Sequence, residues 1–160
     1  MNNKTKYIAE SAVIAALYTV LTVCLPAQSG AVQIRIAEAM TVLPCFTPAA
    51  VPGLFLGCLI SGFFTGLPLD AIIGSTATLI AALLTRLLSK RACNGMRTAW
   101  ICTLPPILCN ALIIPFVLKY VYLCDGTLWY FMLTVGIGEI ISAGVLGMLL
   151  YKALKPFFKA

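Results

Sequence analysis

A few polar and ionisable side chains lie inside long apolar stretches of this sequence, where they could do chemistry. They are Tyr18, Arg35, Glu38, Asp70, Asn110 and Glu139. An ionisable group at membrane depth costs at least about 2.5–3.5 kcal/mol, so each needs a partner, a cavity or a ligand. These residue types accept and donate hydrogen bonds, and together they favour binding of a small polar solute.

Glu139 is the most difficult of these residues to explain by packing alone. It lies about 11 residues into the last apolar stretch, which at 1.5 Å per residue places it roughly 16 Å deep. Its own helix offers no nearby basic residue as a partner. By the same arithmetic Glu38 and Asn110 lie about 8 and 12 Å below the outer face. With Asp70 and Tyr18, they could surround one cavity open to the outside.

A structural explanation stays open for several of these residues. Arg35 and Glu38 have the i,i+3 spacing of an ion pair at the start of a helix. Asn110 could instead make an interhelical hydrogen bond worth on the order of 1 kcal/mol. Tyr18 could serve packing alone.

The chemistry of such a pocket selects its solute. A carboxylate accepts two parallel hydrogen bonds from an amidine-like edge, such as the ring N–H and exocyclic amine of a guanine-type base. An aromatic ring can stack on a flat heterocycle, and a second carboxylate could neutralise a cationic arm. The sequence therefore favours a small, flat, neutral or cationic solute over an anionic one.

The composition requires a membrane environment for these residues. Of the 160 residues 61% are hydrophobic and 10% are charged, and the mean hydropathy is +1.02. Soluble domains have about 45–50% apolar and about 25% charged residues, so residues 1–160 are predicted to form a single integral membrane domain. The net charge of +6 comes from short basic runs between apolar stretches, which does not indicate a nucleic-acid partner.

Metal and cofactor chemistry finds little support. The sequence has no histidine, and its seven cysteines lack a CxxC spacing and lie mostly in apolar stretches. They are interpreted as small hydrophobic residues, and no metal site, cofactor or catalytic residue is predicted.

Four apolar stretches are long enough to cross a bilayer as helices. They are Tyr7–Leu25, Leu69–Leu88, Thr98–Leu118 and Leu128–Leu154. The first lacks a small-residue cleavage site and is interpreted as a retained helix. The region 31–64 between the first two is ambiguous by length.

The positions of the basic residues resolve this region. Nine of the eleven lie near the N-terminus, between the second and third long stretches, or near the C-terminus. If these three clusters are cytoplasmic, an even number of crossings separates the first two. Two short helices fit, Val32–Cys45 and Pro48–Phe64, with Pro48 at a first helical position. The fold predicted is an all-α, compact bundle of six transmembrane helices with both termini cytoplasmic.

The chain also needs a source of energy if it moves a solute. It contains no G-x-x-x-x-G-K-[ST] phosphate loop, so a partner or an ion gradient must supply energy. Ala12 and Ala16 form a small-xxx-small strip that lets another helix approach closely. That helix could belong to a partner or to the same bundle.

Several motifs resemble a known family. The runs Ala12–Tyr18 and Val32–Ala39, the latter with Gln33-x-Arg35-x-x-Glu38, are similar to substrate-binding S components of energy-coupling factor (ECF) transporters. Within that group they most resemble the QueT family of queuosine precursor transporters. The similarity extends through Asp70 to Gly138–Glu139.

The resemblance implies a non-enzymatic, multi-pass protein of the bacterial plasma membrane. Such subunits capture a micronutrient and associate with a coupling protein, through Ala12 and Ala16 here, and with two ATP-binding cassette ATPases. The implied cargo is a 7-deazaguanine base or queuine. The predicted substrate-binding residues are Gln33, Arg35, Glu38, Asp70, Asn110, Glu139 and Tyr18.

Other functions remain possible on the sequence. The chain could be an S component for a vitamin or another nucleobase, or a small proton-coupled exporter in which Glu139 relays the proton. An enzyme with Glu38, Asp70 and Glu139 as metal ligands is disfavoured because histidine, HExxH and paired DxD motifs are absent.

Overall fold

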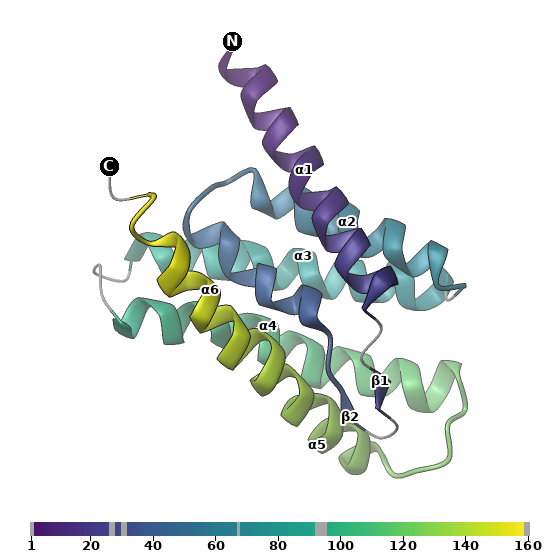
Figure 1. Cartoon of the computed structure of the whole chain (residues 1–160). Helices are drawn as coiled ribbons and strands as arrows, with labels where there is room; N and C mark the ends of the chain where they lie inside the picture. Colours follow the sequence, from purple (N-terminus) through teal and green to yellow (C-terminus); the bar gives the residue numbers. More distant parts are fainter. Residues whose placement is uncertain (1, 26–27, 30–31, 67, 92–95, 159–160) are drawn as a thin grey trace.

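The computed structural model describes residues 2–25, 28–29, 32–66, 68–91 and 96–158, and this part of the chain is almost entirely helical (Figure 1). The long helical runs are made of α1 (Asn3–Cys24), α3 (Pro68–Arg91), α4 (Met96–Phe116) and three consecutive elements, α5 (Leu128–Glu139), η3 (Ile140–Leu146) and α6 (Gly147–Leu154). The last three run on without a break. Shorter elements are the 3₁₀ helix η1 (Ile36–Cys45), α2 (Ala50–Phe64) and the π-helical turn η2 (Val117–Val121).

Four helical runs in the described residues are long and apolar enough to cross a membrane. They are Asn3–Cys24, Ala71–Arg91, Ala99–Val121 and Leu128–Leu154. They coincide with the four long stretches predicted from the sequence, and that prediction is confirmed. The elements η1 and α2 are shorter apolar helices of 10 and 15 residues.

The region before η1 differs from the prediction. Val32 and Gln33 form strand β2, which pairs antiparallel with β1 (Gln28–Ser29), so the expected helix starts at Ile36 and not at Val32. In the described residues the fold is therefore all-α except for this pair of strands, whose hydrogen bonds satisfy backbone N–H and C=O groups that a helix would otherwise pair internally. Similarly, α2 starts at Ala50, and Pro48 lies in the preceding turn.

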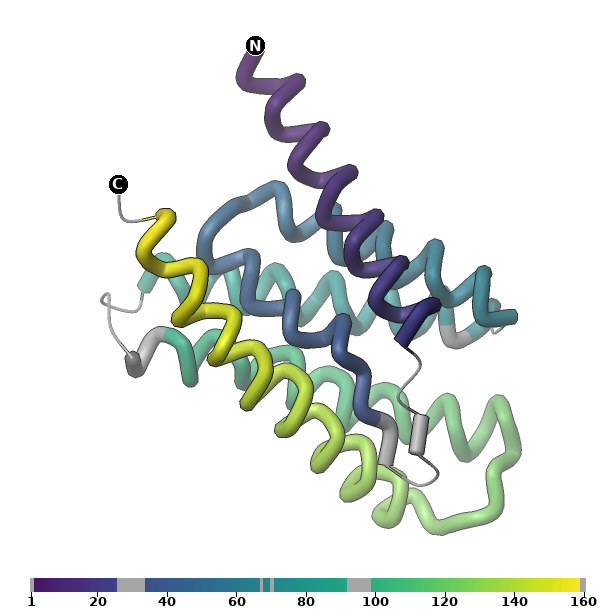
Figure 2. The backbone as a smooth tube through the Cα atoms, viewed as in Figure 1, coloured from purple at the N-terminus to yellow at the C-terminus, as the bar shows by residue number. Residues whose placement is uncertain are grey.

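The 3₁₀ helix η1 lies at the centre of the bundle. It contacts α1, α2, α3, α4, η3 and α6, and Figure 2 shows it between α1 and the α5–α6 run. Most of its side chains are buried, including Met40 and Val42 in the two hydrophobic clusters of the core. At about 2.0 Å per residue its ten residues extend roughly 20 Å. The side chains on η1 are thus held in place by contacts from several sides.

Glycines bring α1 and α2 into close contact. A Cβ atom on Gly53 would lie 2.8 Å from the Ser11 carbonyl oxygen, and one on Gly57 would lie 2.8 Å from the Tyr18 Cβ. Gly53 and Gly57 have the GxxxG spacing that permits close helix packing in membranes. The Ser11 hydroxyl also donates to the Ala49 carbonyl at 2.9 Å. This contact fixes which face of α1 points inward.

The helix α4 continues through Pro105, Pro106 and Pro115. Because Pro106 has no N–H, the Cys102 carbonyl four residues earlier loses its helical donor. The Thr85 hydroxyl of α3 donates to that carbonyl at 3.1 Å. Rescue of a freed carbonyl by a neighbouring hydroxyl explains how α4 stays helical inside an apolar bundle.

Arg86 has a structural role beyond its place in a basic cluster. Its Nη1 donates to the Pro44 and Cys45 carbonyl oxygens at 3.0 and 3.5 Å. These carbonyls are at the C-terminal end of η1, where the helix leaves acceptors without internal donors. Arg86 therefore ties α3 to the end of the central helix.

Candidate functional site

Tyr18 and Glu38 form the first contact of a buried polar cluster. Tyr18 lies on the face of α1 that packs against α2, and Glu38 lies in the first turn of η1. The Tyr18 hydroxyl donates to Glu38 Oε1 at 2.5 Å, and both side chains are 1% exposed. The hydrogen bond therefore connects α1 to the central helix inside the apolar core.

Asn110 and Glu139 form the second contact. Asn110 lies on α4, and Glu139 is the last residue of α5. The Asn110 Nδ2 donates to Glu139 Oε1 at 2.9 Å, and both residues are buried. The other carboxyl oxygen, Glu139 Oε2, is buried and has no hydrogen-bond partner among the described residues. Glu139 Oε2 is thus an available acceptor, and the hydrogen bond from Asn110 to Oε1 fixes its position.

The two contacts belong to one electrostatic cluster. Glu139 interacts with both Glu38 and Arg35, and Arg35 also acts on Tyr18. The Arg35 backbone N–H donates to the Ser142 hydroxyl at 3.1 Å, which joins the start of η1 to the π-helical segment η3. π-Helical segments are frequent at functional sites because they shift side chains out of helical register.

Cys58 and Thr78 extend the cluster to α2 and α3. The Thr78 hydroxyl donates to Cys58 Sγ at 3.6 Å, and Cys58 interacts with Tyr18 and Glu38. Sequence reasoning did not assign these two residues or Ser142 to the site. The spacing of Ser142 three residues after Glu139 was a usable signal, whereas Cys58 resembles any other buried thiol.

The structure brings together four of the predicted substrate-binding residues, Tyr18, Glu38, Asn110 and Glu139, with Arg35 within electrostatic range. The backbone of Gln33 lies in β2 and that of Asp70 in the first turn of α3. The side chains of Gln33 and Asp70 lie outside the described part of the structure. The binding role of all seven residues stays a prediction.

The predicted partner-binding strip lies on the outer face of α1. Ala12 and Ala16 are exposed, whereas Ser11, Ala15 and Tyr18 are buried against the bundle. In the described residues the alanine strip is therefore not used for packing within the chain.

The polar groups of the cluster include both hydrogen-bond donors and acceptors. The cluster offers carboxyl oxygens, an amide, a phenol, a thiol and hydroxyls, in a setting where each contact is shielded from water. Within the described residues no group of three His, Cys, Asp or Glu side chains could hold a metal ion. The described cysteines are free thiols, of which Cys24 and Cys124 are exposed, and Cys93 lies outside the described residues.

Long apolar helices around a buried polar cluster define a multi-pass helical membrane protein. A family model described as "QueT transporter" matches residues 8–156. The chain therefore belongs to the QueT transporter family, as its motifs suggested.

One curated relative is named "Queuosine precursor transporter QueT", from Lactococcus lactis subsp. cremoris (strain MG1363). It is 35% identical to this chain over 81 residues, which cover 49% of this chain and 48% of the relative. The matched stretch thus spans about half the length of that protein. No solved structure matches the chain.

Proposed function

We propose that this chain is the substrate-capture subunit of an ECF-type importer that takes up a queuosine precursor from outside. The observation that carries the proposal is the buried Glu139 Oε2, which has no hydrogen-bond partner among the described residues. Leaving a buried acceptor without a donor costs about 1–3 kcal/mol. A ligand N–H placed there would recover this free energy on binding.

The rest of the cluster favours a 7-deazaguanine base or queuine as that ligand. Glu139 can accept from the ring N–H or exocyclic amine of the base, and Asn110 holds the carboxyl group in one orientation. Glu139 is within electrostatic range of a second carboxyl group, that of Glu38, and a cationic arm on the ligand would meet complementary charge at this acidic pair. The printed name of the relative names the same class of cargo.

The membrane arrangement we propose has six crossings, with η1 and α2 as short ones. Figure 1 shows the start of α1, the end of α6, the end of α3 and the start of α4 toward the same end of the bundle. That end carries the basic residues Lys6, Lys90 and Arg91, which the positive-inside rule assigns to the cytoplasm. The proposed location is the bacterial plasma membrane.

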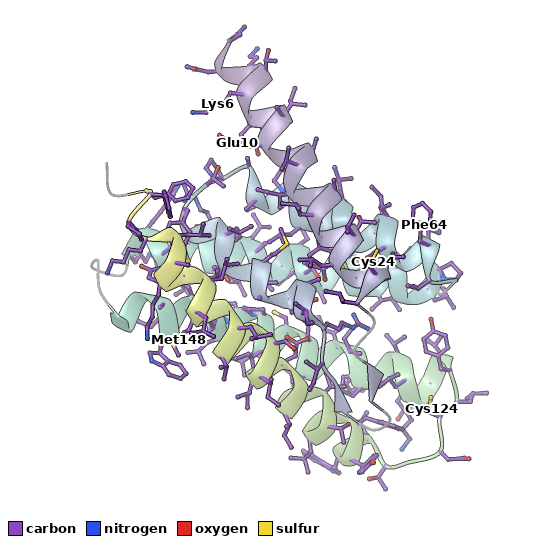
Figure 3. The ribbon with its side chains drawn as sticks, in the orientation of Figure 1. Lys6, Glu10, Cys24, Phe64, Cys124 and Met148 are labelled. Carbon is purple, nitrogen blue, oxygen red and sulfur yellow. The ribbon has the colours of Figure 1, made fainter. Side chains whose placement is uncertain are left out.

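The proposed partners are an ECF coupling protein and two ATP-binding cassette ATPases, which supply the energy. Support comes from α1, of which 17% is buried, compared with 39–44% for the other long spans. Beside its N-terminal half, which projects from the bundle and carries Lys6 and Glu10 (Figure 3), lies an apolar groove of about 560 Å³. A partner helix packed on Ala12 and Ala16 would also cover this groove.

Ligand binding to the purified chain tests the proposed site. Isothermal titration calorimetry in detergent with 7-aminomethyl-7-deazaguanine should give saturable binding. Glu139→Gln should weaken it by about 1.5–3 kcal/mol, the value of a hydrogen bond to a charged group. Glu10→Gln is the matched control, because Glu10 bonds Thr47 at the edge of the bundle and not in the cluster.

Equal affinity of the Glu139→Gln variant and the control would contradict the site. Saturable binding of a vitamin but not of a deazaguanine would reassign the cargo. Transport by the chain alone in vesicles, abolished by an uncoupler, would contradict the ATPase partnership and favour a proton-coupled exporter.

Co-purification with a coupling protein and its ATPases tests the partner surface. Ala12→Trp and Ala16→Trp should each abolish the complex while leaving ligand binding by the chain unchanged. Val145→Trp, at an exposed position on η3, is the control and should leave the complex intact. Retention of the complex in both alanine variants would contradict the assignment of this face.

A further inference from the structure

A second groove lies between α3 and α4. Its volume is about 400 Å³, and leucines from both helices line it, among them Leu84, Leu87, Leu104 and Leu108. Arg91 is the charged residue of the lining. None of its lining residues belongs to the polar cluster, so a ligand of this groove would be separate from the proposed substrate.

The exposed leucines of the groove form an apolar surface that suits a hydrocarbon chain. Leu87 and Leu108 are 56% and 57% exposed. Pro105, which has no N–H, lies in the α4 wall of the groove. The Thr85–Cys102 hydrogen bond holds the two helices together nearby, so the groove is fixed by a contact between its walls.

The α3 wall of the groove is short enough to lie within one membrane leaflet, with its basic end at the headgroup level. From Leu84 to Arg91 the α3 wall rises about 10 Å at 1.5 Å per residue. One leaflet of the hydrocarbon core is about 15 Å deep. Arg91 lies in the last turn of α3 beside Lys90, and Trp100, 53% exposed, lies near the start of α4. Basic and indole side chains are typical of the headgroup level.

We propose that this groove binds one acyl chain of an anionic phospholipid, whose phosphate contacts the Arg91 guanidinium. The choice of an anionic lipid follows from charge. A basic residue near the membrane surface attracts anionic lipid by about 1 kcal/mol. A zwitterionic headgroup carries its own cation and gains less from contact with Arg91.

Native mass spectrometry of the delipidated full-length chain tests this proposal. The probes are 1-palmitoyl-2-oleoyl phosphatidylglycerol and the phosphatidylcholine with the same chains. The chain should bind phosphatidylglycerol about fivefold more tightly, which corresponds to about 1 kcal/mol. Arg91→Gln should remove this preference, and Lys90→Gln, an equal loss of charge outside the groove, should retain it.

Two further measurements separate the acyl chain from the headgroup. Leu108→Trp fills the groove and should weaken both lipids, and excess glycerol 3-phosphate should not displace bound phosphatidylglycerol. Equal affinity of the unmodified chain for both lipids, or equal effects of Arg91→Gln and Lys90→Gln, would overturn the proposal. Displacement by glycerol 3-phosphate, or unchanged affinity in Leu108→Trp, would overturn the acyl-chain site.

Discussion

At the scale of single residues, each buried carboxyl group of the cluster has a different kind of neutral donor. Glu38 Oε1 accepts from the Tyr18 phenol, and Glu139 Oε1 accepts from the Asn110 amide. Each of these donors lowers the free-energy cost of burying a carboxyl oxygen, because the apolar interior does not solvate it. The two donors come from α1 and α4, so satisfying the carboxyl groups also ties distant helices together.

Tyr18→Phe tests the first of these contacts. The ring and its packing stay, but Glu38 Oε1 loses the hydrogen bond from the phenol in a buried setting. We expect the free energy of unfolding to fall by about 1.5–3 kcal/mol, measured by denaturation in detergent micelles. Tyr120→Phe, at a position 63% exposed, is the control and should change it little. Equal stability of the two variants would show that the hydrogen bond contributes nothing.

The sequence could indicate the depth of these residues but not their pairing. Helical rise places Tyr18, Glu38, Asn110 and Glu139 in one half of the bundle, and the structure brings them together. The rotation of each helix about its axis decides which donor meets which carboxyl group. That rotation depends on contacts between helices, such as Gly57 against Tyr18, which lie outside any one segment.

At the scale of elements, apolar run length predicts the long helices well and the short ones less well. A run of about 20 apolar residues has few alternatives to a transmembrane helix. The segment 32–45 is shorter and contains Pro44, so its local sequence does not distinguish an α-helix from the strand and 3₁₀ helix that form. The pairing of β2 with β1 then fixes where η1 begins.

The close contact of α1 with α2 predicts a strong effect of one methyl group. In Gly57→Ala the new Cβ would lie 2.8 Å from the Tyr18 Cβ and 2.9 Å from the Ala15 carbonyl oxygen. Overpacking of this kind costs about 1–3 kcal/mol, so the melting temperature in detergent should fall.

The control for this prediction is another glycine. A Cβ on Gly136 would come no closer than 3.8 Å, to the Ala111 Cβ. Gly136→Ala should therefore be neutral or stabilise the helix by up to about 1 kcal/mol, because alanine favours a helix over glycine. Equal melting temperatures of the two variants would contradict close packing of α1 on α2.

The proline-containing helix α4 gives a prediction of its own. Thr85→Val removes the hydroxyl that donates to the Cys102 carbonyl, and keeps the side-chain shape. We expect a loss of about 0.6–1.7 kcal/mol, the range for such bonds in membrane proteins, measured as resistance to denaturation. Thr76→Val is the control, because the exposed Thr76 hydroxyl bonds only the Ile72 carbonyl of its own helix.

A loss of stability in Thr76→Val as large as in Thr85→Val would assign the effect to helix propensity. It would not support rescue of the proline-freed carbonyl.

At the scale of the whole molecule, the central helix η1 extends from the polar cluster to the basic end of the bundle. The element carries Glu38 in its first turn, and at its other end Arg86 binds the Pro44 and Cys45 carbonyls. From Glu38 to Cys45 the helix rises about 14 Å at about 2.0 Å per residue, and this length separates the polar cluster from the basic end. A solute at the cluster and a partner at the basic end would not compete for the same surface.

The proposed orientation can be measured with cysteines already in the sequence. Cys124 is exposed in the α4–α5 connection, distant from both chain ends (Figure 3). Cys93 lies between α3 and α4 in sequence, within the basic cluster.

With six crossings and cytoplasmic termini, a membrane-impermeant maleimide should label a variant that retains only Cys124 in intact cells. A variant that retains only Cys93 should be labelled only after permeabilisation. The reverse pattern would invert the orientation, and labelling of both in intact cells would contradict an odd number of crossings between them.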